Sequence, residues 1–429
     1  MAKIRKLDIP EGWVETTVGQ LGKVKGGKRL PLGYTFADSL TKFPYLRVCD
    51  FENGSIDVNN LEYLPEKTQK LISNYIISRD DIYISIAGTI GIVGIIPSEL
   101  DGANLTENAA KITNISRGFN QQFLMYFLNS HFVQEQIRSL MGITTQPKLA
   151  LERIRQIKVI APKYKEQQKI AEILSTCDEA SDKIGVRIEK LKHIKQGLMQ
   201  DLFRFGVDEN GNPRTEKTHK LIEWKVRKSI QVLYMKGRIG WQGLKKDEFL
   251  EAGNYLVTGI HFNEKNRVSW EKCFRISDRR YRQAPEIQLR LKDVLITKDG
   301  TIGKVALIDY LPGNASLNSH LLVLRPLTND IMPEFIYYQL FTTRFMRYIE
   351  NIKTGSTLAG LTQKNFGNFE LIIPSLKEQE QIVTMLASAD EAIEKEIAYK
   401  NKLLAIKRGL MEDLLSGKVR VNHLIEKCS

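Results

Sequence analysis

Two long stretches of the chain place apolar residues in a seven-residue rhythm and contain no proline, over about residues 165–203 and 377–415. The apolar positions of the first stretch are Ile170, Leu174, Cys177, Ile184, Ile188, Leu191, Leu198 and Leu202, with Ser181 and Lys195 interrupting them. Those of the second, less regular stretch are Ile382, Leu386, Ala389, Ile393, Ile397, Leu404, Leu410 and Leu414. The rhythm is typical of a coiled-coil seam, and about 38 residues at ~1.5 Å each make a rod of roughly 57 Å. Because such a rod needs a partner along its seam, we expect the two helices to pair with each other.

Shorter elements with a strand pattern precede each long helix. Residues 80–87 alternate toward a β-strand that ends in a glycine-broken turn. A short helix is predicted over 123–138, with a counterpart over 334–349, and the strands predicted at 157–160 and 370–373 each close on a proline. The pattern therefore predicts a strand-rich globular part before each helix.

The second half of the chain repeats the first at a constant shift of 212 residues. The sequence Gly-Thr-Ile-Gly at 88–91 recurs at 300–303, and Asp-Glu-Ala at 178–180 recurs at 390–392. Further pairs at this shift are Phe123 with Phe335, Pro162 with Pro374, Glu166 with Glu378, Gln167 with Gln379, and Ile170 with Ile382. A period this long excludes a solenoid and indicates two copies of a whole module. We expect an antiparallel helix pair with an approximate two-fold axis, which would place the globular parts at opposite ends.

The predicted fold class is α/β, with two globular domains joined by two long helices that form an antiparallel coiled coil. The expected segments are 1–163 for the first domain, 164–206 for the first helix, 207–374 for the second domain, 375–416 for the second helix and 417–429 for a C-terminal tail. The similarity between the copies nearly vanishes in about the first 70 residues of each, so the two globular domains are expected to differ there.

Composition and charge add a partner class to this picture. The chain of 429 residues has a formal net charge of +13, and residues 208–373 hold 26 basic against 18 acidic side chains. An excess concentrated in one globular segment favours a nucleic-acid partner. The four scattered cysteines, the start without an apolar leader and apolar runs shorter than the ~18 residues of a membrane span predict a cytoplasmic protein with reduced thiols and no membrane partner.

Sequence motifs for catalysis do not emerge from this chain. It has no Pro-Pro pair, which the Asp/Asn-Pro-Pro-aromatic motif of DNA amino-methyltransferases requires, and no Gly-x-Gly after a strand. Residues 22–28 imitate a phosphate loop, but Arg29 stands where Ser or Thr would hold magnesium. The six histidines lie too far apart for a local metal motif. We therefore expect a recognition scaffold that binds no metal or cofactor of its own.

The repeated motifs resemble those of the specificity subunits of type I restriction–modification enzymes. The resemblance covers nearly the whole chain and rests on the Gly-Thr-Ile-Gly turn, on Pro-x-x-x-Glu-Gln-x-x-Ile at the start of each helix (162–170 and 374–382), and on Gly-Leu-Met-x-Asp-Leu at each helix end (197–202 and 409–414). Each motif is modest alone, but two ordered copies of the set are specific.

The resemblance implies a non-catalytic subunit with two target-recognition domains. They would read the two parts of an asymmetric, interrupted DNA site while the helices set the spacer. Two methyltransferase subunits would bring S-adenosylmethionine and methylate adenine, and restriction subunits that use ATP and magnesium could join. Three alternatives are a stand-alone DNA-binding coiled-coil protein without restriction partners, an enzyme with degenerate motifs and a coiled-coil protein that binds no DNA.

Candidate DNA contacts fall into six groups. The first two are basic hairpin loops, followed by the Gly-Thr-Ile-Gly turns, polar loops before the closing strands, two possible base readers and an arginine patch around Tyr281. The basic loops contain Lys25, Lys28 and Arg29 in the first copy and Lys236 and Arg238 in the second, and the turns contain Thr89 in the first copy and Lys298, Asp299, Thr301 and Lys304 in the second. The polar loops contain Thr144, Thr145, Gln146 and Lys148 in the first copy and Ser356 and Thr357 in the second. The possible base readers are Asn104 and His320, and the arginine patch is Arg279, Arg280 and Arg282. Cations, hydroxyls and amides suit phosphate or base edges. The alternatives are solvated turns and faces for the charged groups, and packing roles for Asn104 and His320.

Overall fold

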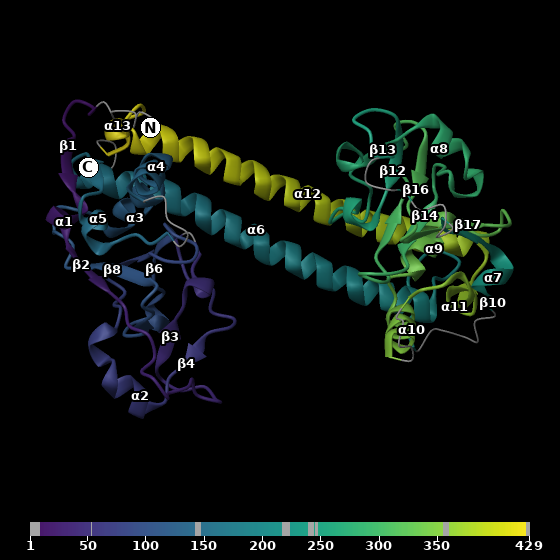
Figure 1. Cartoon of the computed structure of the whole chain (residues 1–429), viewed down its shortest axis with the longest axis horizontal. Coiled ribbons are helices and arrows are strands. Elements are labelled where there is room, and N and C mark those ends of the chain that lie inside the picture. The colour runs from purple at the N-terminus through teal and green to yellow at the C-terminus, as the bar shows by residue number, and fades with distance from the viewer. Residues whose placement is uncertain are drawn as a thin grey trace. The chain divides into compact units, whose positions relative to one another are not determined.

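The computed structural model describes residues 9–52, 54–141, 147–216, 224–238, 244, 248–354 and 360–425. The chain divides into two compact units (Figure 1). Unit 1 comprises residues 1–185 with 398–429, and unit 2 comprises residues 186–397. Each unit therefore combines one globular part with a piece of each long helix.

The described residues of unit 1 form three β-sheets, which pack with short helices. The four-stranded sheet has the order β2 (Lys23–Gly26), β8 (Ala109–Thr113), β5 (Ile82–Ser85) and β6 (Val93–Ile95), and all its pairs are antiparallel. The three-stranded sheet has the order β4 (Glu62–Tyr63), β3 (Pro44–Leu46) and β7 (Asn104–Leu105), with β3 and β7 parallel. The third sheet pairs β1 (Val14–Thr17) with β9 (Lys158–Ala161). The helices are α1 (Val18–Leu21), α2 (Glu66–Leu71), α3 (Gln121–Asn129), α4 (His131–Leu140), α5 (Leu151–Arg155) and α13 (Asn422–Ile425).

In the part of unit 2 that the structure describes, three corresponding sheets have the same order of strands. They are β11 (Leu233–Lys236), β17 (Leu321–Pro326), β14 (Val294–Thr297) and β15 (Val305–Leu307); β13 (Phe274–Ile276), β12 (Asn254–Val257) and β16 (Ala315–Leu317); and β10 (Lys225–Lys228) with β18 (Glu370–Ile373). Its helices are α7 (Ser229–Val232), α8 (Asp278–Arg282), α9 (Pro333–Gln339), α10 (Thr343–Thr354) and α11 (Gln363–Gly367). This strand-by-strand match confirms the predicted internal repeat.

The two long helices are α6 (Tyr164–Phe205) and α12 (Leu376–Leu415). In unit 1, the start of α6 and the end of α12 share one apolar core, which includes Ile170, Leu174 and Leu414. In unit 2 the roles are reversed, because the end of α6 and the start of α12 share the core that includes Leu202 and Ile382. The helices are therefore antiparallel, as expected from the internal repeat. Burying one such side chain stabilises the fold by about 1.5–3 kcal/mol.

Three local expectations are wrong in detail. The seam does not contain Leu404, which is 38 % exposed, because the neighbouring Leu403 is the more buried of the two. Each predicted short helix is two helices, since Ser130 takes an extended conformation between α3 and α4 and its hydroxyl donates to the Phe127 carbonyl oxygen at 2.6 Å. Residues 340–342 separate α9 from α10, and the Thr342 hydroxyl likewise donates to the Gln339 carbonyl oxygen at 2.7 Å.

The two predicted basic hairpin loops also begin as strands. Lys25 lies on β2, opposite Lys111 of β8, and Lys236 lies on β11, opposite Val323 of β17. Backbone pairing with the adjacent strand thus overrides the loop character that the glycines suggest.

Candidate nucleic-acid interface

Strand ends and loops far apart in the sequence meet at one edge of the four-stranded sheet in each unit. We call residues 25–29, 86–91, 105–109 and 147–149 the first turn edge. Backbone hydrogen bonds hold it together, because the Lys28 N–H donates to the Leu105 carbonyl at 2.8 Å and the Leu149 N–H donates to the Ile86 carbonyl at 2.9 Å. Four separate sequence segments therefore present one surface.

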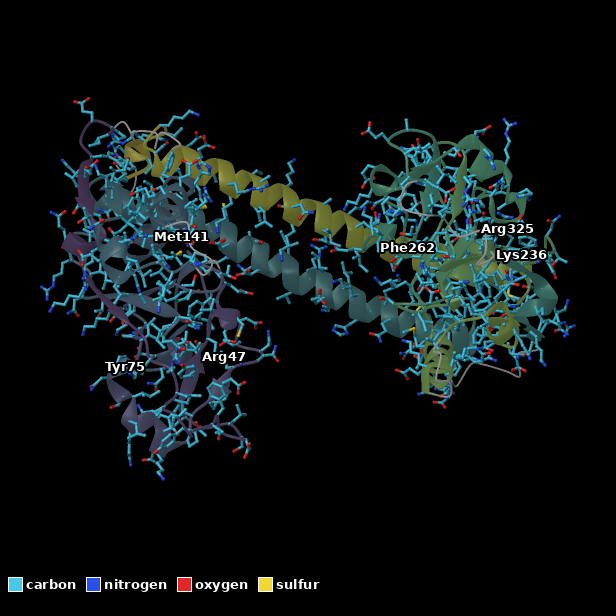
Figure 2. The ribbon with its side chains drawn as sticks, in the orientation of Figure 1. Arg47, Tyr75, Met141, Lys236, Phe262 and Arg325 are labelled. Carbon is cyan, nitrogen blue, oxygen red and sulfur yellow. The ribbon has the colours of Figure 1, made fainter. Side chains whose placement is uncertain are left out.

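The second turn edge comprises residues 236–238, 298–304, 317–321 and 360–361. The Leu361 N–H donates to the Lys298 carbonyl at 2.6 Å, and the Lys298 N–H donates to the His320 carbonyl at 2.9 Å. The structure thus brings together the Lys236 strand end (labelled in Figure 2), the Gly-Thr-Ile-Gly turn and His320, which the sequence singled out separately.

The Gly-Thr-Ile-Gly turn has the same backbone in both units. Gly88 and Gly91 have φ of 74° and 90°, and Gly300 and Gly303 have φ of 64° and 90°. These left-handed conformations favour glycine, which explains why both glycines recur in the two copies. Thr89 is exposed at the tip of the first turn.

Side-chain chemistry differs between the two turns. In the second, Lys304 and Thr301 are exposed and Lys298 is half-buried, whereas the first copy has Ile92, Thr89 and Ile86 at these positions. Asp299 does not project alone, since its Oδ1 lies 2.5 Å from His320 Nδ1. The second Gly-Thr-Ile-Gly turn therefore offers cations to a polyanion, whereas the first turn has none at these positions.

The first basic group is exposed and lightly tethered. Arg29 is paired with Glu107 at 3.3 Å, although its side chain is 75 % exposed, and the Lys28 ammonium lies 5.8 Å from the centre of the Tyr75 ring. Lys25 and Lys148 are exposed as well. Cations in this state can reach phosphates without first breaking strong contacts.

Arg238 of the second group lies inside the fold. It is 2 % exposed, and its guanidinium donates to the Leu317 carbonyl and the Ser316 hydroxyl, each at 3.2 Å. Nη1 has no hydrogen-bond partner among the residues that the structure describes, and burial lowers the pKa of the guanidinium. In this conformation Arg238 supports strand β16, and its charge does not reach the surface.

The candidate base reader Asn104 and the residues of the arginine patch differ in exposure and in their contacts. Asn104 is 1 % exposed and donates to the Ile72 carbonyl at 2.8 Å, which is a packing role. On α8, Arg280 pairs with Glu248 at 2.6 Å and Arg282 pairs with Asp278 at 2.8 Å, while Arg279 is exposed. Thr144, Thr145, Gln146, Ser356 and Thr357 lie outside the described residues.

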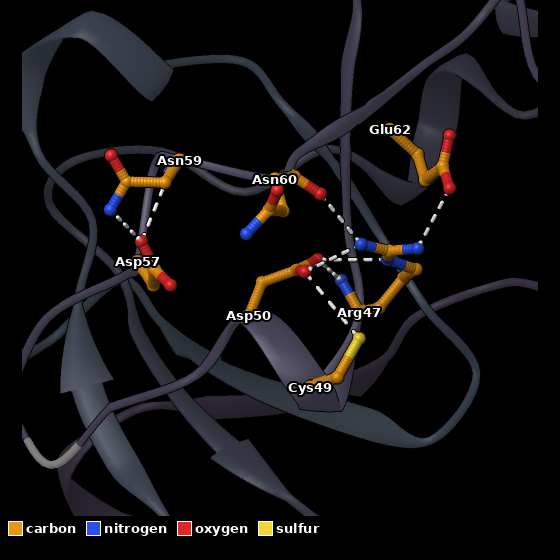
Figure 3. A network of polar contacts seen from close by, with 7 residues as sticks. All are labelled: Arg47, Cys49, Asp50, Asp57, Asn59, Asn60 and Glu62. Atoms are coloured by element: carbon orange, nitrogen blue, oxygen red, sulfur yellow. Dashed lines mark hydrogen bonds and ion pairs between the residues drawn. The ribbon is translucent and has the colours of Figure 1, made fainter. Parts of the chain in front are cut away.

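A partly buried ion network that the sequence did not reveal shapes the divergent part of unit 1 (Figure 3). Arg47 donates to Asp50 and Glu62, each at 2.8 Å, and to the Asn60 carbonyl at 2.8 Å. The Asp50 carboxylate also accepts the Arg47 N–H at 2.7 Å, which caps the turn after β3. No repeat marks these residues, because the copies lose similarity here.

The matching turn of unit 2 uses different chemistry. His261 replaces the capping carboxylate, since its Nδ1 accepts the Thr258 N–H at 3.1 Å. The imidazole is buried, which lowers its pKa and keeps it neutral, and its ring meets Phe274 edge-on at 5.0 Å. The two units therefore share a backbone scaffold but hold unlike loops upon it.

Comparison with known proteins identifies the scaffold. The family described as the type I restriction modification DNA specificity domain matches residues 10–193 and again residues 223–404. The chain belongs to this family. Each specificity domain thus includes one globular part and most of the helix that follows it.

Several relatives match nearly the whole chain. The putative MjaX specificity subunit of Methanocaldococcus jannaschii is 24 % identical and covers 96 % of this chain and 95 % of its own. The EcoKI specificity subunit of Escherichia coli is also 24 % identical, covering 98 % and 95 %. The solved S subunit of M. genitalium has a TM-score of 0.55 at 17 % identity and covers 96 % of this chain and 97 % of its own, which shows a shared fold. Relatives named as subunits of type I restriction enzymes disfavour the stand-alone alternative.

The Glu-Gln motif anchors the globular part of each specificity domain to the helix that follows it. Gln379 is fully buried: its amide oxygen accepts the Met332 N–H at 2.9 Å, and its amide nitrogen donates to the carbonyls of Asp330 and Pro374 at 2.8 and 3.0 Å. Gln167 makes the equivalent contacts in the first domain. The motif is therefore structural, and its recurrence reflects a repeated junction.

The preceding glutamates close each domain on a neighbouring segment. Glu166 receives both nitrogens of the Arg420 fork at 2.8 Å, and Glu378 accepts from Arg214 at 2.9 Å and from Trp224 Nε1 at 3.1 Å. The C-terminal tail thus binds the glutamate of the first specificity domain. The segment after α6 binds the glutamate of the second domain in the same way.

Replacing Gln379 with leucine should lower the free energy of unfolding of the second domain by about 3 kcal/mol. The substitution removes three hydrogen bonds to the backbone of Met332, Asp330 and Pro374, two of them part-buried and the one to Pro374 buried. Each lost bond costs about 0.5–1.5 kcal/mol, and more where the group left without a partner is buried. Urea unfolding followed by tryptophan fluorescence measures the change, with the exposed Gln200→Leu as control. A loss below about 1 kcal/mol would contradict the anchoring role.

None of the described helices combines the length and the apolar character that crossing a membrane requires. Within the same residues, no three His, Cys, Asp or Glu side chains gather in a way that could hold a metal ion.

Proposed function

We propose that this chain is the DNA-recognition subunit of a type I restriction–modification complex, and that each specificity domain reads one part of a bipartite, asymmetric target. The observation that carries the proposal is the pair of turn edges, which share a backbone but differ in side chains. Two identical readers would give a palindromic target, so unlike edges support an asymmetric one.

Within each half-site, contacts divide between backbone and bases. Exposed cations such as Lys25, Lys236 and Lys304 lie at the turn edges and suit phosphates, which fix position without reading sequence. The loops held by the Arg47 network in the first domain and by His261 in the second are where the copies diverge, and they suit base-specific contacts.

The helices would then set the spacer between the half-sites, and the subunit would act through partners. Two methyltransferase subunits would supply S-adenosylmethionine and the adenine-methylating chemistry. Restriction subunits could add ATP- and magnesium-dependent cleavage. The segment boundaries at 163, 206, 374 and 416 stay part of this proposal, as does a cytoplasmic location.

The proposal that this chain recognises DNA while a partner methylates it can be tested with plasmid DNA. The plasmids come from cells that express this chain with and without a methyltransferase subunit. Sequencing for modified adenine should find a methylated motif only when both are present. Methylation produced by the chain alone would make it an enzyme in its own right and would overturn the proposal.

Removing both cations of the second turn should weaken DNA binding without changing the target. We expect Lys298→Ala with Lys304→Ala to reduce affinity about tenfold at physiological salt and to reduce the slope of log affinity against log salt by about two, because two phosphate contacts are lost. Fluorescence anisotropy with the assembled complex measures both quantities.

The matched control removes the same charge from another sheet of the same domain, with Lys225→Ala and Lys228→Ala on the exposed strand β10. An equal loss of affinity in both double variants would mean that general charge, and not the second turn edge, binds the DNA.

A further inference from the structure

A tyrosine, an aspartate and a lysine meet in unit 1 where the specificity domain joins both long helices. Tyr126 of α3 donates its hydroxyl hydrogen to Asp178 of α6 at 2.6 Å, and Lys407 of α12 forms an ion pair with the same carboxylate. The lysine ammonium also lies 5.2 Å from the centre of the Tyr126 ring. All three pairs therefore interact, and each member comes from a different element.

Unit 2 contains the same arrangement with the helices exchanged. Tyr338 of α9 donates to Asp390 of α12 at 2.9 Å, Lys195 of α6 lies 2.5 Å from that carboxylate, and its ammonium lies 5.7 Å from the tyrosine ring. In sequence, Lys195 is an interruption of the apolar seam. In the structure it is the member that α6 contributes to the second cluster.

Both clusters combine half-buried charges with a buried phenol. The lysine side chains are 17 % and 22 % exposed, and the tyrosines are 4 % and 3 % exposed. Burial and the adjacent carboxylate raise the pKa of both tyrosines, so their hydroxyls stay protonated and donate. A charge in this setting is costly when its partner is removed.

We propose that the two Tyr-Asp-Lys clusters fix the register of α6 against α12 and the position of each globular part on these two helices. Their members are therefore positioning residues, which determine the length of the DNA spacer. This inference rests on the proposed function in its last step only. We call the clusters the first and second lock, formed by Tyr126, Asp178 and Lys407 and by Tyr338, Asp390 and Lys195.

The equal spacing of the lock residues on the two helices allows a single register of α6 against α12 to form both locks. Asp178 precedes Lys195 by 17 residues on α6, and Asp390 precedes Lys407 by the same 17 on α12. Apolar side chains seven residues apart are nearly interchangeable in a seam, because hydrophobic contact is not directional. The ion pairs are directional, and one polar seam position is known to specify register at a cost in stability.

A slip of one heptad shows why two locks are needed. Sliding α12 in one direction would bring Lys400 opposite Asp178, which could rebuild the first lock, but it would leave Lys195 facing Val383. Sliding it in the other direction would set Asp178 against Leu414 and Lys195 against Ile397. In either slipped register at least one charge loses its partner.

The tyrosines add the domain to the lock. Because each hydroxyl bonds the aspartate that also holds the opposite helix, a globular part cannot tilt on the helix that follows it without breaking its contacts to both helices. The seam leucines alone would not provide this link, since they contact the domain only through apolar surfaces.

The test replaces both lysines with methionine, in Lys195→Met with Lys407→Met, because methionine keeps the side-chain length and removes the charge. Spin labels at Lys67→Cys and Lys272→Cys, both exposed, report the distance between the domains in the full chain after Cys49, Cys177, Cys273 and Cys428 are replaced. We expect one narrow distance distribution in the parent and a broad one in the variant. With methyltransferase subunits bound, the preference for the natural spacer over one a base pair longer should fall about tenfold.

Two further variants separate positioning from general stability. Exchanging the charges in both locks, with Asp178→Lys, Lys407→Asp, Asp390→Lys and Lys195→Asp, re-forms both ion pairs, and each tyrosine oxygen can accept from the lysine that replaces its aspartate. This variant should restore the narrow distribution and the spacer preference. Replacing the exposed Lys190 and Lys402 with methionine is the control and should change neither. Circular dichroism verifies that each variant keeps its helices.

A distribution that stays narrow in the lysine variant, or one that the charge exchange fails to narrow, would overturn the inference. A broadened distribution with an unchanged spacer preference would uphold the lock and refute the spacer-setting role of the helices.

Discussion

Inserting one heptad into both long helices at once should lengthen the recognised spacer by about three base pairs. The insertion points are between Gly185 and Val186 and between Ile397 and Ala398, where the chain passes from one unit to the other. Seven helical residues add about 10.5 Å, and B-DNA rises about 3.4 Å per base pair. The distances Asp178–Lys195 and Asp390–Lys407 grow equally along the sequence, so both locks can still form.

Methylation of a plasmid library with spacers of every length around the natural one measures this shift. The longer subunit should modify the extended target and lose at least about a hundredfold of its activity on the natural one. A heptad in α6 alone is the control, since it mismatches the two locks and should abolish selective modification. An unchanged spacer length in the doubly extended chain would refute the proposal that the helices set the spacer.

Exchanging residues 1–160 for the corresponding segment of another family member should change one half of the target completely and leave the other half unchanged. The physical reason is that the first domain has its own cores, which include Ile84 and Phe123 in one cluster and Tyr83 and Leu46 in another. Its recognition loops are therefore supported from within unit 1.

Sequencing of modified adenines in cells that carry the exchanged subunit gives the new motif. The reciprocal exchange of residues 208–373 is the matched experiment and should change only the other half. A change in both halves after a single exchange would contradict independent reading by the two domains.

The parts of the fold that follow from periodicity could be predicted from the sequence. The two helices, the repeat at 212 residues and the glycine turn at 88–91 each depend on local patterns or on matches between the copies. Position along the helix seam was harder, because Leu403 and Leu404 are adjacent leucines and only the packed helix pair decides which of them is buried.

The candidate site could be predicted only in outline. Lys298, Lys304 and His320 belong to one edge, but their meeting depends on strand pairing that no local pattern reveals. The sequence also cannot show that Arg238 is buried against β16 or that Lys195 is paired, since both facts depend on residues about 80 and 195 positions away. The positions of the charged residues along the chain are thus known from the sequence, whereas their interaction partners are known only from the structure.

The most direct test of two unlike readers on one scaffold is the target itself. Genome-wide sequencing of modified adenine, in cells that express the complete subunit with its methyltransferase, should give one motif with two different specified segments separated by a fixed number of unspecified bases. A continuous motif, or two identical halves arranged as a palindrome, would contradict the account.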